Sequence, residues 1–99
     1  MTVKAYLMCK VNSGNERDIC KKLTEFVNVI ESCIVYGEYD VIVKLQTRDL
    51  EELDFVTEEM RRSTPGIILT STAIVAREYK GKTQIDRSIL RVDRSASSV

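Results

Sequence analysis

Residues 35–77 read VYGEYDVIVKLQTRDLEELDFVTEEMRRSTPGIILTSTAIVAR, and the order of elements in this stretch decides the fold. The dipeptide Gly37-Glu38 lies between the β-branched residues 30–36 and the apolar run 39–45, which predicts two strands joined as a hairpin. A helix is expected next, and Pro65 ends it, because proline has no backbone N–H and disfavours helical angles in the residue before it. Residues 67–77 then return to strand-forming side chains.

The helix within this stretch is expected to begin at Thr47 or Asp49, since either side chain can accept a free backbone N–H at a helix start. Arg61-Arg62 lie near its end, where the helix dipole favours cations, and we interpret them as a solvated helix end rather than an anion site. The apolar residues of this helix recur at helical spacing and predict its buried stripe: Leu50, Leu53, Val56 and Met60.

The N-terminal half supplies one more strand and one more helix. Residues 2–11 alternate apolar and polar side chains, which is the two-residue period of a strand. After residues 12–14, a helix of about three turns is expected. Its apolar positions are Ile19, Cys20, Leu23, Phe26 and Val27. The full order is strand, helix, strand, strand, helix, strand, which predicts an α+β fold on the ferredoxin-like βαββαβ plan, with both helices on one face of an antiparallel sheet.

The length of 99 residues fits a single domain with one core. We expect that domain to span residues 1–79, because residues 80–99 change to a sequence that ends rich in serine. This last segment is interpreted as a C-terminal extension or tail.

Composition and charge narrow the classes of function. Fifteen basic side chains balance fifteen acidic ones, so direct binding to nucleic acid is disfavoured. We find no signal-peptide core and no apolar run long enough to span a membrane, which favours the cytoplasm and no membrane partner. Cys9, Cys20 and Cys33 match no zinc spacing and are interpreted as free thiols, and no metal or cofactor is predicted.

The face of the sheet opposite the helices is expected to carry apolar side chains. Tyr6, Met8 and Ile42 fall on positions that would be polar in a monomer with one solvated sheet face. An apolar area of this kind usually marks an association surface, and a symmetric dimer packed sheet against sheet would cover it. The alternative is that the C-terminal tail folds back as the cover.

Four motifs together resemble one known family. They are residues 36–40, with the sequence Tyr-Gly-Glu-Tyr-Asp, the helix start at residues 49–53, the turn at residues 64–67, and the strand at residues 70–75. In this order and spacing, over residues 3–79, they resemble the effector-binding domain of the Lrp/AsnC family of regulators, the regulation-of-amino-acid-metabolism (RAM) domain.

The resemblance implies a dimeric α/β-barrel, often assembled into a ring, with an amino acid or related small effector held where dimers meet. Family members usually carry an N-terminal helix-turn-helix, whereas this chain begins at the first strand and looks like a stand-alone form. We therefore expect it to modulate transcription through hetero-assembly with helix-turn-helix members of the family, rather than by binding DNA itself.

Five residues are candidates for effector binding. Gly37 suits a turn that needs positive φ and leaves room for a ligand at the backbone, although a simple hairpin also explains it. Asp40 can accept an ammonium group, or it can bond to nearby amides as a turn residue. Thr70 and Thr72 point to the same side of their strand, where two hydroxyls can share a ligand, although threonine is common in strands. Tyr39 can form an apolar wall but suits a core position better.

An enzyme is the main alternative, because small dimeric α/β-barrels include cofactor-free monooxygenases. General acid–base chemistry needs a positioned group with a tuned pKa, and the chain has no histidine. Cys9 or Cys33 would lack a histidine to activate it as a nucleophile. We therefore expect no enzymatic activity. A third interpretation is an assembly scaffold that joins related transcription factors without sensing a ligand.

Overall fold

A computed structural model describes residues 2–82, and its elements follow the predicted order. They are β1 (Val3–Val11), α1 (Glu16–Leu23), β2 (Val29–Ile34), β3 (Val41–Thr47), α2 (Leu50–Ser63) and β4 (Ile67–Ile74). The α+β, ferredoxin-like βαββαβ fold is therefore confirmed. Residues 83–99, which include most of the expected extension 80–99, lie outside the described residues.

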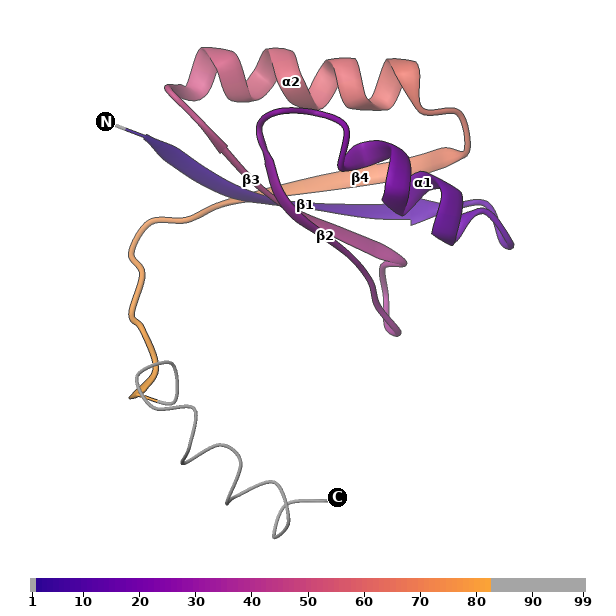
Figure 1. Ribbon diagram of the computed structural model, residues 1–99, viewed down its shortest axis with the longest axis horizontal. Coiled ribbons are helices and arrows are strands. Elements are labelled where there is room, and N and C mark those ends of the chain that lie inside the picture. Colours follow the sequence, from indigo (N-terminus) through magenta and orange to yellow (C-terminus); the bar gives the residue numbers. More distant parts are fainter. Residues whose placement is uncertain (1, 83–99) are drawn as a thin grey trace, which may run out of the picture.

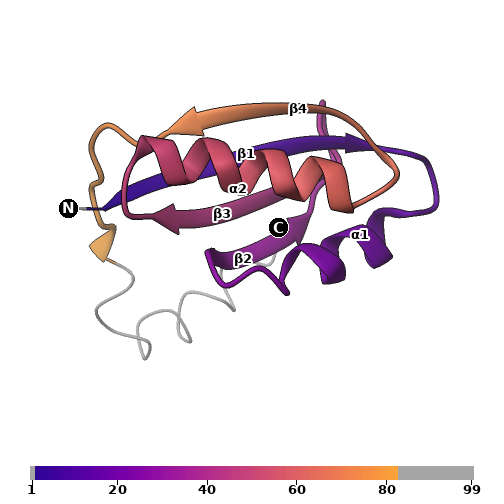
Figure 2. The ribbon, with the colours of Figure 1, turned by 90° about the horizontal axis from the view of Figure 1, so that it is seen from above.

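The sheet has four strands in the order β2-β3-β1-β4, and every neighbouring pair is antiparallel. Both helices lie on one face of the sheet, as predicted, and the other face carries no element of residues 2–82 (Figure 1). Seen from above, α2 runs along the sheet over its middle strands and α1 lies beside β2 (Figure 2). The strands β2 and β4 form the two edges.

The core lies between the helices and the covered face of the sheet. Alternate residues of β1 and β3 point into it, because side chains of a strand alternate between its two faces. The helices contribute Ile19, Cys20 and Leu23 from α1, and Leu53, Val56 and Met60 from α2. Leu50, which we predicted on the buried stripe of α2, is the first residue of the helix and is 59% exposed. The strands contribute Ala5, Leu7, Cys9 and Val11 from β1, and Val41, Val43 and Leu45 from β3. No helix within residues 2–82 is long and apolar enough to cross a membrane.

The first helix is shorter than predicted. It ends at Leu23 after eight residues, and Val27, which we expected on its apolar stripe, is 95% exposed. The chain leaves the α-helix at Thr24, whose hydroxyl donates to the Lys21 carbonyl at 2.6 Å, and whose N–H donates to the same carbonyl at 3.1 Å. These bonds to the third preceding residue tighten the last turn, and Phe26 packs against the core from the following loop.

The hairpin between β2 and β3 is longer than the predicted Gly37-Glu38 turn. The strands pair as far as Ile34 and Val41, and residues 35–40 form the connection. Tyr39 and Asp40 therefore lie in the loop and not in the strand. Asp40 bonds on both sides: its N–H donates to the Cys9 carbonyl of β1 at 2.9 Å, and its carbonyl accepts the N–H of Val35, just after β2, at 2.9 Å.

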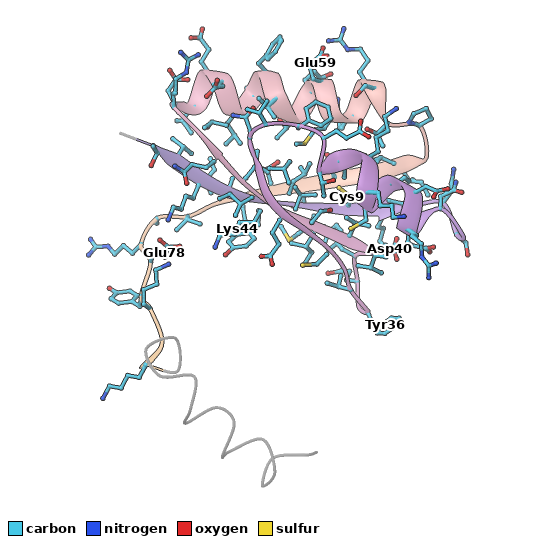
Figure 3. All side chains as sticks on the ribbon, viewed as in Figure 1. Cys9, Tyr36, Asp40, Lys44, Glu59 and Glu78 are labelled. Atoms are coloured by element: carbon cyan, nitrogen blue, oxygen red, sulfur yellow. The ribbon has the colours of Figure 1, made fainter. Side chains whose placement is uncertain are left out.

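The last strand ends at Ile74 and not at Arg77 as predicted, and its last pair with β1 is Ile74 with Ala5. One more bond, from the Val75 N–H to the Lys4 carbonyl at 2.9 Å, continues the ladder. The chain then turns to the uncovered side of the sheet, where Glu78 pairs with Lys4 at 2.9 Å (Figure 3). Lys4 bonds to this carboxyl and lowers the pKa of Glu78.

The start of α2 resolves the choice between the two predicted caps in favour of Asp49. The Asp49 carboxylate accepts the Glu52 N–H at 2.8 Å, and the Glu52 carboxylate accepts the Arg48 N–H at 2.7 Å. The first bond satisfies a backbone donor in the first turn of the helix, and the second satisfies the donor just before the cap. The pair is similar to a capping box. Thr47 does not cap the helix; its hydroxyl donates to the Asp49 carbonyl at 2.9 Å, a bond within the loop before α2.

Candidate functional site

Asp40 is fixed between β1 and the loop that joins β2 to β3. Its carboxylate Oδ2 accepts the Val11 N–H at 2.9 Å, and its carbonyl accepts the Val35 N–H at 2.9 Å. Together with the bond to Cys9, these contacts determine where the side chain lies. Within residues 2–82 the second carboxylate oxygen, Oδ1, has no hydrogen-bond partner, so one acceptor of a well-positioned anion is available for a ligand.

A hollow of about 620 Å³ lies beside Asp40, between the start of α1 and the end of β2. Its charged residues come from α1 and from the loop: Glu16, Arg17, Asp18 and Asp40. Gly14, Ile34 and Tyr36 also line it; Ile34 adds an aliphatic group, and the fully exposed Tyr36 adds an aromatic ring at its open side. Both labelled residues of the loop are visible in Figure 3, where Asp40 lies near α1 and Tyr36 projects from the loop. A site with this lining can contact both charges and an apolar group of a small metabolite.

Gly37 and Tyr39 do not line this hollow. Gly37 has a φ of +152°, so the predicted positive φ is confirmed, and a Cβ at this position would meet nothing within 4 Å. Tyr39 is half-buried in the same loop. Both residues shape the loop that carries Asp40, and the turn explains the glycine without a ligand.

Thr70 and Thr72 lie on the other side of β1. Thr70 and Thr72 lie on the same side of their strand, as their spacing predicts. Thr70 pairs with Cys9 and Thr72 with Leu7, whose side chains point into the core, so this side is the helix-covered face of the sheet. They border the groove between α2 and the edge strand β4. Because Asp40 and Thr70 flank Cys9 from opposite sides of β1, a single chain does not bring the candidate residues into one hollow.

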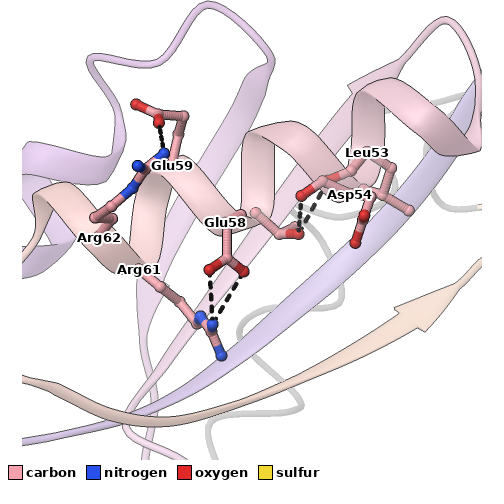
Figure 4. Close-up of polar contacts among 7 residues, drawn as sticks. Leu53, Asp54, Glu58, Glu59, Arg61 and Arg62 are labelled. Carbon is pink, nitrogen blue, oxygen red and sulfur yellow. Dashed lines mark hydrogen bonds and ion pairs between the residues drawn. The ribbon is translucent and has the colours of Figure 1, made fainter.

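The groove beside the threonines has an apolar half and a charged half. Thr72 lies with Leu50, Asp54 and Ile74, whereas Thr70 lies with Glu58, Arg61 and Arg62. Both arginines are occupied, since Arg61 Nη2 donates to the two carboxylate oxygens of Glu58 at 2.9 and 3.0 Å and Arg62 pairs with Glu59 (Figure 4). This pairing agrees with their interpretation as a solvated helix end.

The cysteine environment does not suit a nucleophile. Cys9 is fully buried, and burial, with a smaller contribution from Cys20, raises the pKa of the Cys9 thiol to about 11. The Cys20 sulfur lies 3.0 Å from the Ser32 hydroxyl, and Cys33 is exposed. All three thiols are free, as predicted. The reactive form of cysteine is the thiolate, so a raised pKa makes Cys9 inert.

The uncovered face of the sheet is apolar at its centre, as predicted. Met8 pairs with Ile42, and Tyr6 pairs with Ala73, and all four residues lie on the face opposite the core residues of their strands. Leu69 at the edge is 53% exposed. Lys44, which pairs with Tyr6 on the neighbouring strand, lies with its Nζ 6.0 Å from the centre of the Tyr6 ring, so a cation borders this apolar centre (Figure 3).

Sequence reasoning missed the part of the hollow that α1 supplies. Arg17 is not among the apolar positions predicted for α1, and nothing in the local sequence relates it to residues 34–40. The contact depends on the strand order, which sets the end of β1, the start of α1 and the loop after β2 at the same end of the sheet (Figure 1). The signal that could have found Arg17 is the predicted ferredoxin-like plan, because it fixes which loops and helix ends meet at one end of the sheet.

A family model and related regulators place this chain in the same family. The model of the Lrp/AsnC ligand binding domain matches residues 4–85. The HTH-type transcriptional regulator FL11 of Pyrococcus horikoshii is 30% identical over 81 residues, which are 82% of this chain and 53% of that protein. The chain thus spans about half the length of this relative.

Several solved structures are similar to this chain. Hypothetical protein PHS023 from Pyrococcus horikoshii is 40% identical with a TM-score of 0.70, over 78% of this chain and 93% of that one. The transcriptional regulator NMB0573 of Neisseria meningitidis, solved in complex with L-Met, shares the fold at 16% identity with a TM-score of 0.74, over 89% of this chain and 58% of that one. The topology, the family match and these relatives together identify the chain as a member of the Lrp/AsnC ligand binding domain family.

Proposed function

We propose that this protein binds a free amino acid, or a close analogue, and that occupancy changes its assembly with other copies or with related regulators. The observation that carries this proposal is the carboxylate of Asp40, which is held by the Val11 N–H through Oδ2 and keeps Oδ1 available beside a hollow. A carboxylate in such a position accepts an ammonium group in a charge-assisted hydrogen bond, which is stronger than a neutral one. Membership of a ligand binding domain family supports the same role.

The ligand class follows from the size and lining of the hollow. A volume of about 620 Å³ suits a small metabolite, and Ile34 and Tyr36 can contact an apolar side chain beside the charged groups. A protein with the same fold was solved with L-Met, so free amino acids are the first class to test.

The uncovered sheet face provides the route to assembly. A second copy packed face to face would remove Tyr6, Met8 and Ile42 from water and complete a dimeric α/β-barrel. The threonines lie on the helix-covered face, which such a dimer leaves outside, so in a ring of dimers Thr70 and Thr72 of one chain would reach an effector held by Asp40 of another. A ligand that contacts two chains stabilises the assembled state by its differential affinity.

The output we propose is regulation of transcription in the cytoplasm through helix-turn-helix members of the family, without direct DNA contact by this domain. Balanced charge supports this route, since fifteen basic residues are matched by fifteen acidic ones. We propose no enzymatic activity, because the chain has no histidine and the most buried thiol has a raised pKa.

Calorimetric titration with each proteinogenic amino acid, with light scattering on every sample, tests the proposal. We expect heat and a change in mass for a small set of ligands. Asp40→Asn keeps an acceptor for the Val11 N–H but loses the charge, so it should abolish the heat. The exposed Glu25, which lines neither the hollow nor the groove beside the threonines, gives the control Glu25→Gln, which should bind as the wild type does. The absence of any heat across the set would favour a scaffold that joins regulators without sensing a ligand.

A further inference from the structure

Arg17 lines the hollow beside Asp40, and no ion pair within the described residues accounts for its charge. Its side chain is exposed, and within residues 2–82 it forms no ion pair. The arginines at and before α2 behave differently, since Arg48, Arg61 and Arg62 each pair with a glutamate three or four residues away. Arg17 therefore keeps all its guanidinium donors available at the edge of a hollow that also contains a fixed anion.

We propose that Arg17 binds the α-carboxylate of the effector while Asp40 binds its α-ammonium. This inference rests on the proposed amino-acid binding and assigns the two ends of the ligand. A guanidinium presents two parallel N–H groups that match the two oxygens of a carboxylate, which a lysine at this position would not. The order of charges then orients the ligand, and its side chain lies toward Ile34 and Tyr36.

The remaining charges of the hollow determine which amino acids fit. Glu16 and Asp18 also line it, and one oxygen of Glu16 accepts the Gly14 N–H at 3.1 Å. Three carboxylates against one guanidinium leave an acidic surplus once the ligand's own two charges are paired. This surplus repels a second carboxylate on the ligand. The hollow should therefore accept neutral or basic amino acids and reject aspartate and glutamate.

The test compares Arg17→Gln with Lys21→Gln by calorimetry, using each proteinogenic amino acid and the carboxamide of every one that binds. Lys21 lies one turn further along the same helix, is exposed, and is absent from the lining of the hollow, so it matches the change in net charge. Because a hydrogen bond to a charged group contributes about 1.5–3 kcal/mol, Arg17→Gln should weaken amino-acid binding about ten-fold or more. It should leave carboxamide binding unchanged, and Lys21→Gln should change neither.

The possible results either support or overturn the proposed role of Arg17. Wild-type binding that prefers the acid over the carboxamide, with the preference lost in Arg17→Gln alone, supports it. Binding that is lost in Asp40→Asn but keeps its full strength and preference in Arg17→Gln overturns the role of Arg17 and leaves the proposed function standing. Tight binding of glutamate or aspartate overturns the predicted selectivity. If the wild type binds no amino acid, both the proposed function and this inference fail.

Discussion

The two carboxylate oxygens of Asp40 serve different purposes, and this affects how the residue can be tested. Oδ2 satisfies the backbone N–H of Val11 in a partly buried place, while Oδ1 is the proposed ligand acceptor. Asp40→Ala would leave the Val11 N–H without its partner, which costs about 1–3 kcal/mol. We expect a loss of this size in the free energy of unfolding measured with urea.

Asp40→Asn separates stability from binding. Its amide oxygen can still accept the Val11 N–H, so the loss in the free energy of unfolding should be about 1 kcal/mol smaller than for Asp40→Ala. If the two variants were equally stable, the bond to Val11 would have no structural role and the fixed position of the carboxylate would need another cause.

The cysteines give a second prediction for single residues. Burial raises the pKa of Cys9 above that of an unfolded chain, so its thiol stays protonated in the native state, and the stability from this effect is present below about pH 9 and is lost as the pH rises toward 11. Cys33 is exposed in a single chain but pairs with Ile42 on the face of the proposed dimer, so at mildly alkaline pH Ellman's reagent should label it in the native protein wherever that face is free.

Cys9 and Cys20 should react only after denaturation, since both are buried. A Cys33→Ser variant should show almost no native labelling. Rapid labelling of that variant would mean that the core around Cys9 opens readily, in conflict with its complete burial.

Among the elements, α2 offers a direct test of helix capping. Asp49→Ala removes the acceptor of the Glu52 N–H, and loss of such a cap costs about 0.5–2 kcal/mol. The exposed Asp54→Ala, which lies within α2 and has no capping bond, is the matched control. Urea unfolding should show the loss for Asp49→Ala alone; equal effects would assign it to charge and not to the cap.

The elements also show where sequence reasoning succeeded and where it stopped. The periodicity of apolar residues predicted every strand and helix in the correct order. The alternation in β1 and the helical spacing in α2 are visible in the sequence because one face of each element is buried. The same periodicity extended α1 to Val27, since helical spacing continues past the point where Thr24 bonds back to Lys21 and ends the helix. The predicted connection between β2 and β3 was also too short. Asp40 donates to the Cys9 carbonyl and accepts the Val11 N–H, and these contacts between segments far apart in the sequence do not show in local periodicity.

The candidate site was predicted only in part for a similar reason. The period of β4 places Thr70 and Thr72 on one face, but both faces of that strand carry aliphatic residues, so only pairing with Cys9 and Leu7 shows that this is the covered face. Asp40 was identified from its motif, whereas Arg17 joins it through the strand order alone.

For the whole molecule, the uncovered sheet face should hold the dimer together. Met8 lies at the centre of this face, between Ile42 and Ser71 on the neighbouring strands, so Met8→Glu would bury a charge against the partner copy. Sedimentation velocity should show at least two chains for the wild type and a single chain for this variant. Phe55→Glu places the same charge on the exposed side of α2 and should leave the dimer intact. A monomeric wild type would contradict this role.

The location of the effector is tested most directly by amide NMR spectra of the isotopically labelled protein, recorded while an amino acid found by calorimetry is added. The amide signals of Gly14, Arg17, Tyr36 and Asp40, which line the hollow between α1 and the β2–β3 loop, should shift together along one saturation curve. If these four signals stay in place while those of the α2–β4 groove move, or if no signal moves, Asp40 does not hold the effector.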